Sequence, residues 1–283
     1  MKHLTIGILL LISYLTAISQ TALYNNYDEH KYYGMIGFSV KLNLKSKPIN
    51  QIVIRVGEYF LNTKYVGGVC DAPDTECLVA NLYELDCVTL VENVLAISLC
   101  IKNQTTSFDD YLAMLQKIRY RNGIINGYAS RLHYFSDWIY YNSLNNFVAD
   151  VTQACGGKPV SKPVHFMSSN SAKYRHLNNN TSLTDSIKAT EQEINNRGLY
   201  YIIPKEEVAQ LENNIEHGDI IAIATNTAGL DYTHTGIAYK KNDRIYLLHA
   251  SLTHKKVEIS DVPLSEYLTK IKSHTGISVI RIK

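Results

Sequence analysis

The sequence predicts an α+β protein in which helices come first and an antiparallel sheet comes last. Up to about residue 215, most apolar residues recur at helical spacing. From Gly218 onward, short runs rich in β-branched and aromatic residues alternate with turn residues. This order of elements is typical of α+β folds. The chain has 283 residues, of which 46% are hydrophobic and 19% charged, enough to build a packed core.

The expected helices have recognisable starts. Pro48 suits the first turn of a helix over 48–62. Residues 85–100 are apolar on nearly every side, and this length favours a buried helix over a strand. Ser107 and Asp110 resemble a capping box that opens a further helix. Further helical segments are expected near Trp138 and over 184–196 and 204–214, with a loop-like stretch at 156–182.

The expected strands are short and follow one another closely. Alternating apolar residues and flanking turn residues predict strands at 220–225, 232–240, 244–251, 256–259 and 277–282. Neighbouring strands joined by short turns predict antiparallel pairing.

The N-terminus predicts export. Residues 1–19 combine a short basic start, an apolar run from Leu4 to Ile12, and small residues at a cleavage site after Ser19. The apolar run is shorter than the roughly 20 residues of a membrane span, so we expect no stable membrane insertion after cleavage. The mature chain, 20–283, is expected to be a single catalytic domain with an added helical region at about 101–215. The predicted location is the periplasm, or otherwise the extracellular space.

The charge balance argues against some partners. Lys and Arg number 28 and Asp and Glu number 26, and no run of basic residues occurs. Nucleic acids and anionic membranes attract strongly basic surfaces, so neither is an expected partner.

An odd number of cysteines leaves at least one thiol free of intramolecular bridges. The five are Cys70, Cys77, Cys87, Cys100 and Cys155. Cys70 and Cys77 flank a short acidic loop, where a local disulfide is plausible. Their spacing does not resemble a zinc-binding pair.

Cys87 is the candidate nucleophile. It lies where a loop becomes the buried helix, with Asp86 as a candidate N-cap. The positive end of a helix dipole favours a thiolate, which predicts a lowered pKa and a reactive sulfur. A buried structural cysteine is the alternative interpretation.

Two histidines on consecutive strands are the candidate base and its partner. A two-residue turn at Lys241 and Asn242, or a four-residue turn in the same register, pairs residues whose numbers sum to 483. His234 and His249 would then lie directly opposite each other on one face. A base with an orienting partner is what a cysteine nucleophile needs. A polar pair at a sheet edge is the alternative.

Several segments together resemble the NlpC-type papain-like cell-wall hydrolases, in particular their N-acetylmuramoyl-L-alanine amidase-like branch. The residues that carry this resemblance are Leu85-Asp86-Cys87-Val88-Thr89-Leu90-Val91-Glu92, Thr233-His234-Thr235-Gly236-Ile237-Ala238, Leu248-His249-Ala250, Lys64-Tyr65-Val66-Gly67-Gly68, 131–138 and 200–205. Val88-Thr89 replaces the superfamily's usual Ser-Gly, and more than a hundred residues separate Cys87 from His234. Both departures favour the amidase branch.

The resemblance implies a papain-like core, with the nucleophile's helix packed on an antiparallel sheet, and a catalytic set of Cys87, His234 and His249. Tyr65 is implied as an oxyanion donor. Arg131 and His133 could contact substrate, or serve a buried salt bridge and the core. The implied substrate is a peptidoglycan-derived muropeptide, cut between N-acetylmuramic acid and L-Ala, with no cofactor or metal.

Three other functions remain open at this point. The nearest is a cysteine endopeptidase that cuts after D-Glu within the stem peptide. A metal hydrolase could use Asp231, His234 and His249 around zinc. An inactive muropeptide- or glycan-binding protein is favoured only by the abundance of tyrosine, 21 residues.

Overall fold

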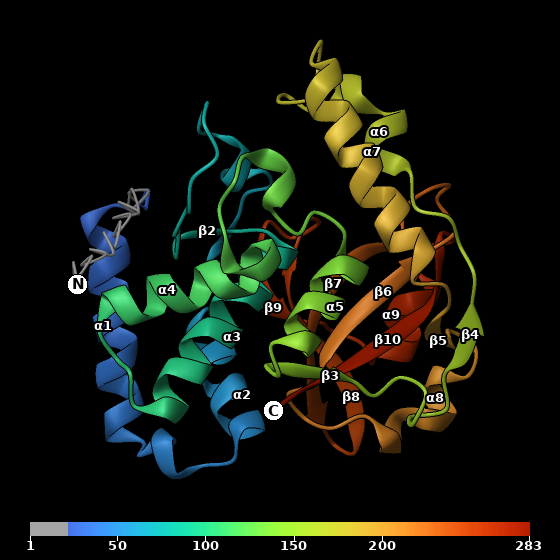
Figure 1. Ribbon diagram of the computed structural model, residues 1–283. Helices are drawn as coiled ribbons and strands as arrows, with labels where there is room; N and C mark the ends of the chain where they lie inside the picture. Colours follow the sequence, from blue (N-terminus) through green and yellow to red (C-terminus); the bar gives the residue numbers. More distant parts are fainter. Residues whose placement is uncertain (1–21) are drawn as a thin grey trace, which may run out of the picture.

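The computed structural model describes residues 22–283 (Figure 1). The predicted signal peptide, 1–19, lies outside the described residues. Within them, no helix combines the length and the apolar character needed to cross a membrane.

Helices dominate the first part of the described chain. The α-helices of the described chain are α1 (Asn26–Lys41), α2 (Ile49–Tyr59), α3 (Cys87–Asn103), α4 (Phe108–Arg119), α5 (Phe135–Leu144), α6 (Phe166–Ser169), α7 (Thr181–Asn196), α8 (Val208–Leu211) and, late in the chain, α9 (Leu264–Thr269). The strands are β1 (Lys64–Tyr65), β2 (Glu84–Leu85), β3 (Val148–Asp150), β4 (Lys158–Val160), β5 (Tyr200–Pro204), β6 (Ile220–Thr225), β7 (Tyr232–Lys241), β8 (Arg244–Ser251), β9 (Lys256–Ile259) and β10 (His274–Ile282).

The fold is α+β, with a ten-stranded, mostly antiparallel sheet. Its strand order is β2-β1-β9-β8-β7-β6-β10-β5-β4, and β3 pairs with β10. Among the strands of residues 22–283, only β1 and β2 pair in parallel. This pairing brings Tyr65 beside Leu85, two residues before Cys87, so the first strands hold the tyrosine near the start of α3.

Residues of the central strands alternate between two cores, as the two-residue period of a strand requires. Ile237 and Leu248 belong to the core that contains α2 and α3, whereas Ala238 and Leu247 belong to a second core with α8 and α9. In Figure 1, α2, α3 and α4 lie beside one another, while α9 lies beside the red strand β10. A third, smaller core gathers α6 and α7.

The structure confirms several elements and corrects others. The predicted strands 220–225, 244–251 and 256–259 have the predicted bounds, and the helix at Ser107 has the expected capping box with Asp110. Residues 204–214 hold only short helical turns, after a strand at Tyr200–Pro204. The stretch 156–182 holds β4 and α6 rather than loop alone. The long helix α1 and the short helix α9 were not expected.

The predicted hairpin register is wrong by two residues. Ile237 pairs with Leu248 and Lys241 with Arg244, so paired numbers sum to 485. The turn is Asn242-Asp243, and both residues have positive φ, 51° and 60°. This is the backbone of the type I′ turn, which asparagine and aspartate tolerate and which matches the twist of the strands. A shift of two keeps every side chain on its face.

Candidate active site

Cys87 is the first residue of α3, as expected. The side chain of Asp86 caps the helix by accepting the backbone N–H of Thr89 at 2.8 Å, and the Thr89 side chain completes a capping box. Most of α3 is buried against α2 and β7, so the cysteine is fixed by the core behind it. Helix start, cap and core thus hold the sulfur in one place.

The prediction of a lowered Cys87 pKa is wrong. Burial, together with the nearby Asp86 carboxylate, raises the pKa of the Cys87 thiol to about 12. Hydrogen bonding from the backbone N–H of Thr235 opposes part of this shift. Desolvation of a charge outweighs the helix dipole here because the sulfur is enclosed. The resting side chain is therefore a thiol.

His234 and His249 are hydrogen-bonded, through His234 Nε2 and His249 Nδ1 at 2.8 Å. In the observed register His234 and His249 are offset by two residues rather than directly opposite, and both remain on one face of the sheet. Burial, together with the nearby His249 and His274 rings, lowers the pKa of His234 to about 3. Burial also lowers the pKa of His249 to about 4. Both rings are neutral at physiological pH.

Cys87 and His234 line the same small cavity, of about 80 Å³, together with His133. Among the described hydrogen bonds, none joins the Cys87 sulfur to His234. The sulfur instead contacts Thr235, the next residue along β7. The site thus places a neutral thiol and a neutral imidazole in one enclosure.

Tyr65 lies close enough to Cys87 for the two to affect each other. Burial, followed by the proximity of Cys87 and Asp86, raises the pKa of Tyr65 to about 12. Its hydroxyl therefore stays protonated at physiological pH and can donate a hydrogen bond. This is the property that an oxyanion donor requires.

His133 lines the cavity of Cys87, and together with Arg131 it also lines a neighbouring cavity of about 210 Å³. Both side chains have protein partners. Arg131 forms ion pairs with Asp71 and Glu76, the latter at 3.1 Å. His133 Nε2 hydrogen-bonds the backbone oxygen of Tyr128 at 2.8 Å, and burial drives the pKa of His133 well below its usual value. The geometry gives each residue a structural role.

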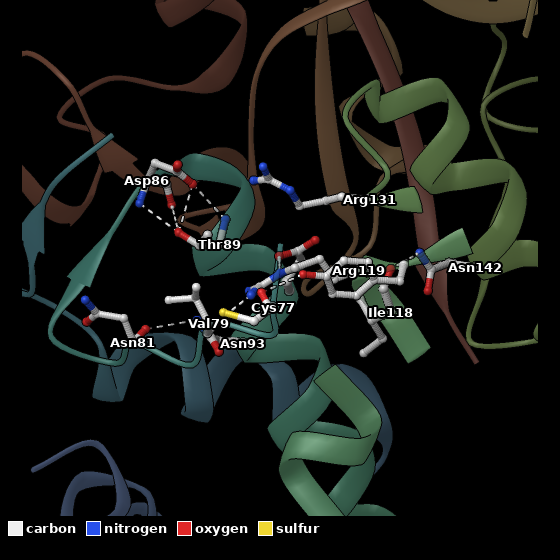
Figure 2. A network of polar contacts seen from close by, with 12 residues as sticks. Cys77, Val79, Asn81, Asp86, Thr89, Asn93, Ile118, Arg119, Arg131 and Asn142 are labelled. Carbon is white, nitrogen blue, oxygen red and sulfur yellow. Dashed lines mark hydrogen bonds and ion pairs between the residues drawn. The ribbon is translucent and has the colours of Figure 1, made fainter. Parts of the chain in front are cut away.

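A buried network of polar contacts lies behind the cavity that Arg131 lines (Figure 2). Arg119 donates to the Glu92 carboxylate at 2.7 Å, and both side chains are almost fully buried. Its guanidinium also donates to the backbone oxygen of Val79, as Figure 2 shows. The network joins α3, α4 and the loop before α3.

The proposed Cys70–Cys77 disulfide is absent. All five cysteines are free thiols. The Cys70 sulfur is enclosed near Arg119 and Arg131, and burial raises the pKa of its thiol to about 11. The local loop therefore uses ion pairs to Asp71 and Glu76, rather than a bridge, for its attachment.

Three residues that lie at the site were not among the predicted site residues. Tyr267 of α9 packs on the histidine pair, with ring centroids 5.3 Å from His249 and 6.4 Å from His234. Glu258 and His274 line a cavity of about 320 Å³ with these rings. Only Glu258 had a signal in the sequence, its place on the strand that follows His249.

Two further hollows adjoin the 80 Å³ cavity that Cys87 lines. The 80 Å³ cavity shares Val88 and His133 with a cavity of about 210 Å³ that contains Arg131, and shares Thr233 and His234 with the 320 Å³ cavity. A larger cavity, of about 590 Å³, lies between α5, β5 and the end of α7, and none of the candidate catalytic residues lines it.

The candidate zinc set is not brought together. The Asp231 carboxylate accepts the backbone N–H of Ser136 at 2.8 Å and that of Tyr232 at 2.7 Å. In residues 22–283, no cluster of three or more His, Cys, Asp or Glu side chains has the arrangement of a metal site. Asp231 therefore acts as an anchor for the start of α5.

Solved structures define the class of protein. An N-acetylmuramoyl-L-alanine amidase from Bacteroides uniformis is 40% identical, with a TM-score of 0.80, over 83% of this chain and 99% of that one. A putative xylanase from Bacteroides fragilis is 38% identical, with a TM-score of 0.77, over 80% and 99%. Protein LPG0564 from Legionella pneumophila, 20% identical with a TM-score of 0.65 over 91% and 97%, shares the fold. No curated protein matches.

The chain belongs to the AmiA-like family, described as N-acetylmuramoyl-L-alanine amidase-like, which matches residues 55–277. The fold and the family agree on a hydrolase of the amidase type with a peptidoglycan-type substrate. The predicted resemblance is therefore confirmed at the level of family.

Proposed function

We propose that this protein is an exported cysteine amidase that hydrolyses the bond between N-acetylmuramic acid and L-Ala in muropeptides. The observation that carries the proposal is the enclosure of Cys87 with His234, whose second nitrogen is hydrogen-bonded to His249. In an amidase-like family, a thiol beside an oriented base supports nucleophilic catalysis. The helix of Cys87 packed on the sheet supports a papain-like core.

The first step forms a thioester. His234 takes the proton of the Cys87 thiol as the sulfur attacks the amide carbonyl of the lactyl group. Because both groups are neutral at rest, proton transfer accompanies attack rather than preceding it. The backbone N–H of Cys87 and the Tyr65 hydroxyl donate to the oxyanion. The protonated His234 then gives its proton to the nitrogen of L-Ala, and the C–N bond breaks.

The second step restores the enzyme. His234 removes a proton from water, whose oxygen attacks the thioester carbonyl. The C–S bond breaks, and the sulfur takes back its proton from His234. The products are the sugar with a free lactyl carboxylate and an intact stem peptide. The modest volumes of the three hollows, about 80, 210 and 320 Å³, support small muropeptides rather than intact wall as substrate.

Product identity tests the proposal. The purified chain and its Cys87→Ala variant are incubated with defined disaccharide-peptide muropeptides, and products are identified by mass. We expect release of intact stem peptide by the parent protein and none by Cys87→Ala. Cys77→Ala is the matched control, because this thiol lies outside the cavity that holds Cys87, and it should retain activity.

Other outcomes would redirect the assignment. Cleavage after D-Glu would move the specificity to the endopeptidase alternative and keep the cysteine chemistry. Unchanged activity in Cys87→Ala would overturn the nucleophile assignment, and loss of that activity with a chelator would favour metal chemistry.

Export is part of the proposal. Residues 1–19 would be removed, and the remaining single domain, with its helical region at about 101–215, would act in the periplasm. N-terminal sequencing of the protein recovered from a cell-envelope fraction should begin at residue 20. Recovery of the uncleaved chain in the cytoplasm would contradict this part.

A further inference from the structure

A carboxylate lies directly behind the histidine pair. Glu258 of β9 is the cross-strand partner of His249 on β8, so both side chains stand on the same face. Glu258 Oε1 lies 3.9 Å from His249 Nε2 and 2.6 Å from His254 Nδ1. The side chain of His249 is 3% exposed and that of Glu258 is 18% exposed, whereas His254 is largely exposed. One carboxylate oxygen therefore lies between a buried and an exposed imidazole.

The hydrogen bond between His234 and His249 leaves only two arrangements of protons. Each neutral imidazole carries a single N–H. In the first arrangement, His249 Nδ1–H donates to His234 Nε2, so the proton of His234 is on Nδ1. In the second, His234 Nε2–H donates to His249 Nδ1, so the proton of His249 is on Nε2.

The two arrangements differ in what they offer to Cys87 and Glu258. The first leaves the lone pair of His249 Nε2 facing a carboxylate, and leaves His234 Nδ1 unable to accept a proton. The second turns the His249 Nε2–H toward Glu258 and leaves His234 Nδ1 unprotonated. The partner of one ring nitrogen selects the proton position on the other. A negative charge at 3.9 Å favours the second arrangement.

We propose that Glu258 is a positioning residue that fixes the tautomers of His249 and His234, so that His234 Nδ1 is free to accept the Cys87 proton. This inference rests on the proposed function. The distance of 3.9 Å exceeds a direct hydrogen bond, so Glu258 acts through its charge or through one bridging water. The proximity of Glu258 also opposes part of the effect of burial on the pKa of His249.

The other groups around Glu258 define the controls. His254 shares its carboxylate, Tyr267 of α9 packs on His249, and Lys270, Asp261 and His274 line the same cavity. His254 competes with His249 for one oxygen but is not required to set the tautomer. His254→Ala is therefore the matched control for Glu258→Ala.

The test reads the tautomer in the resting enzyme and needs no substrate. In ¹⁵N-labelled protein, long-range ¹H–¹⁵N spectra distinguish Nδ1–H from Nε2–H. We expect Nε2–H at both His234 and His249 in the parent protein and in His254→Ala. In Glu258→Ala, a substantial part of His234 should change to Nδ1–H, while Glu258→Gln, which keeps an accepting oxygen, should be intermediate. An unchanged tautomer in Glu258→Ala would overturn the proposal.

Two rate measurements connect the tautomer to chemistry. We expect Glu258→Ala to lower kcat for muropeptide hydrolysis by about 10- to 100-fold with little change in KM, as for other residues that orient a site from behind. Alkylation of Cys87 by iodoacetamide, mapped by mass, should slow in parallel. A loss of kcat without a tautomer change would also overturn the proposal. The tautomer and alkylation results stand even if no muropeptide is cleaved, so failure of the proposed function remains distinguishable.

Discussion

His234 and His249 share a 2.8 Å hydrogen bond although they are offset along the β7–β8 ladder. The diagonal placement lets the two rings meet almost edge to face, at 85°, instead of crowding as a directly opposed pair. The bond uses His234 Nε2, so only Nδ1 remains for chemistry. Tyr267 packs against both rings and limits their rotation.

Replacing His249 should separate the need for a hydrogen bond from the need for a ring. His249→Phe keeps a ring but loses the bond to His234, and we expect kcat/KM to fall by about 10²-fold or more, since positioned proton transfer contributes about 10²–10⁴-fold. His249→Asn can still accept from Nε2 and should retain more activity. Steady-state kinetics on muropeptides check this. Equal activity of the two variants would contradict an orienting role.

Tyr65→Phe tests the oxyanion donor. Removing a single oxyanion-hole donor typically costs about 10²–10³-fold in kcat. Because the Tyr65 side chain is only partly buried, we expect little change in the urea midpoint. Tyr83→Phe, at a tyrosine that is 45% exposed and directly precedes β2, is the control and should leave kcat unchanged. A kcat unchanged in Tyr65→Phe would remove this residue from the mechanism.

The buried Arg119–Glu92 pair should matter for stability more than any exposed pair. Arg119→Met leaves the Glu92 carboxylate buried without its partner, and breaking such a pair costs about 3–5 kcal/mol of unfolding free energy. Arg55→Met, which breaks an exposed pair with Glu58, should cost about 1 kcal/mol or less. Urea unfolding measures both. A double variant that also carries Glu92→Leu should recover stability; if it does not, the loss came from packing.

Local signals in the sequence predicted the elements whose ends are set by nearby residues. The capping box of Ser107, the turn-bounded run of β6 and the position of Cys87 at the start of α3 all depend on adjacent residues, and the structure has each of them. Helix α1 shows no clear apolar periodicity in the sequence. One of its few buried residues is Asp28, whose carboxylate accepts a hydrogen bond from the backbone N–H of Leu82.

Features that depend on residues distant in the sequence could not be predicted from local patterns. Strands β1 to β5 have two to five residues each, and their partners lie far along the chain. The sign of the Cys87 pKa shift depends on burial beneath β7, which a single helix start cannot reveal. Tyr267 and His274 join the site only because α9 packs against β8 and β10, and β10 pairs with β6, the neighbour of β7.

The turn that set the register offers a direct test of its own. Asn242 and Asp243 both have positive φ, which costs a residue with a side chain some stability. Asp243→Gly should therefore raise the unfolding free energy by about 0.5–1 kcal/mol, while Asp243→Ala should lower it. The ion pair of Asp243 with Lys240, at 3.8 Å and exposed, contributes little to this difference. Equal stability of the two variants would contradict a left-handed turn.

The neutral, buried histidines should make the fold sensitive to mild acid. His249 has a folded-state pKa of about 4, lowered chiefly by burial, against an ordinary value of 6.5. Below pH 6.5, this histidine is protonated in the unfolded chain but stays neutral in the folded protein. The unfolding free energy therefore falls as pH falls, until the pH reaches the folded-state pKa. The limiting slope is about 1.4 kcal/mol per pH unit for each such group.

Urea unfolding between pH 6.5 and 5 measures this slope and avoids most carboxylate titration. His249→Gln should reduce this slope by about 1 kcal/mol per pH unit, whereas His30→Gln, at an exposed helix position, should not. Parallel slopes in all three proteins would mean that the folded protein binds this proton and that His249 is not held neutral beside His234.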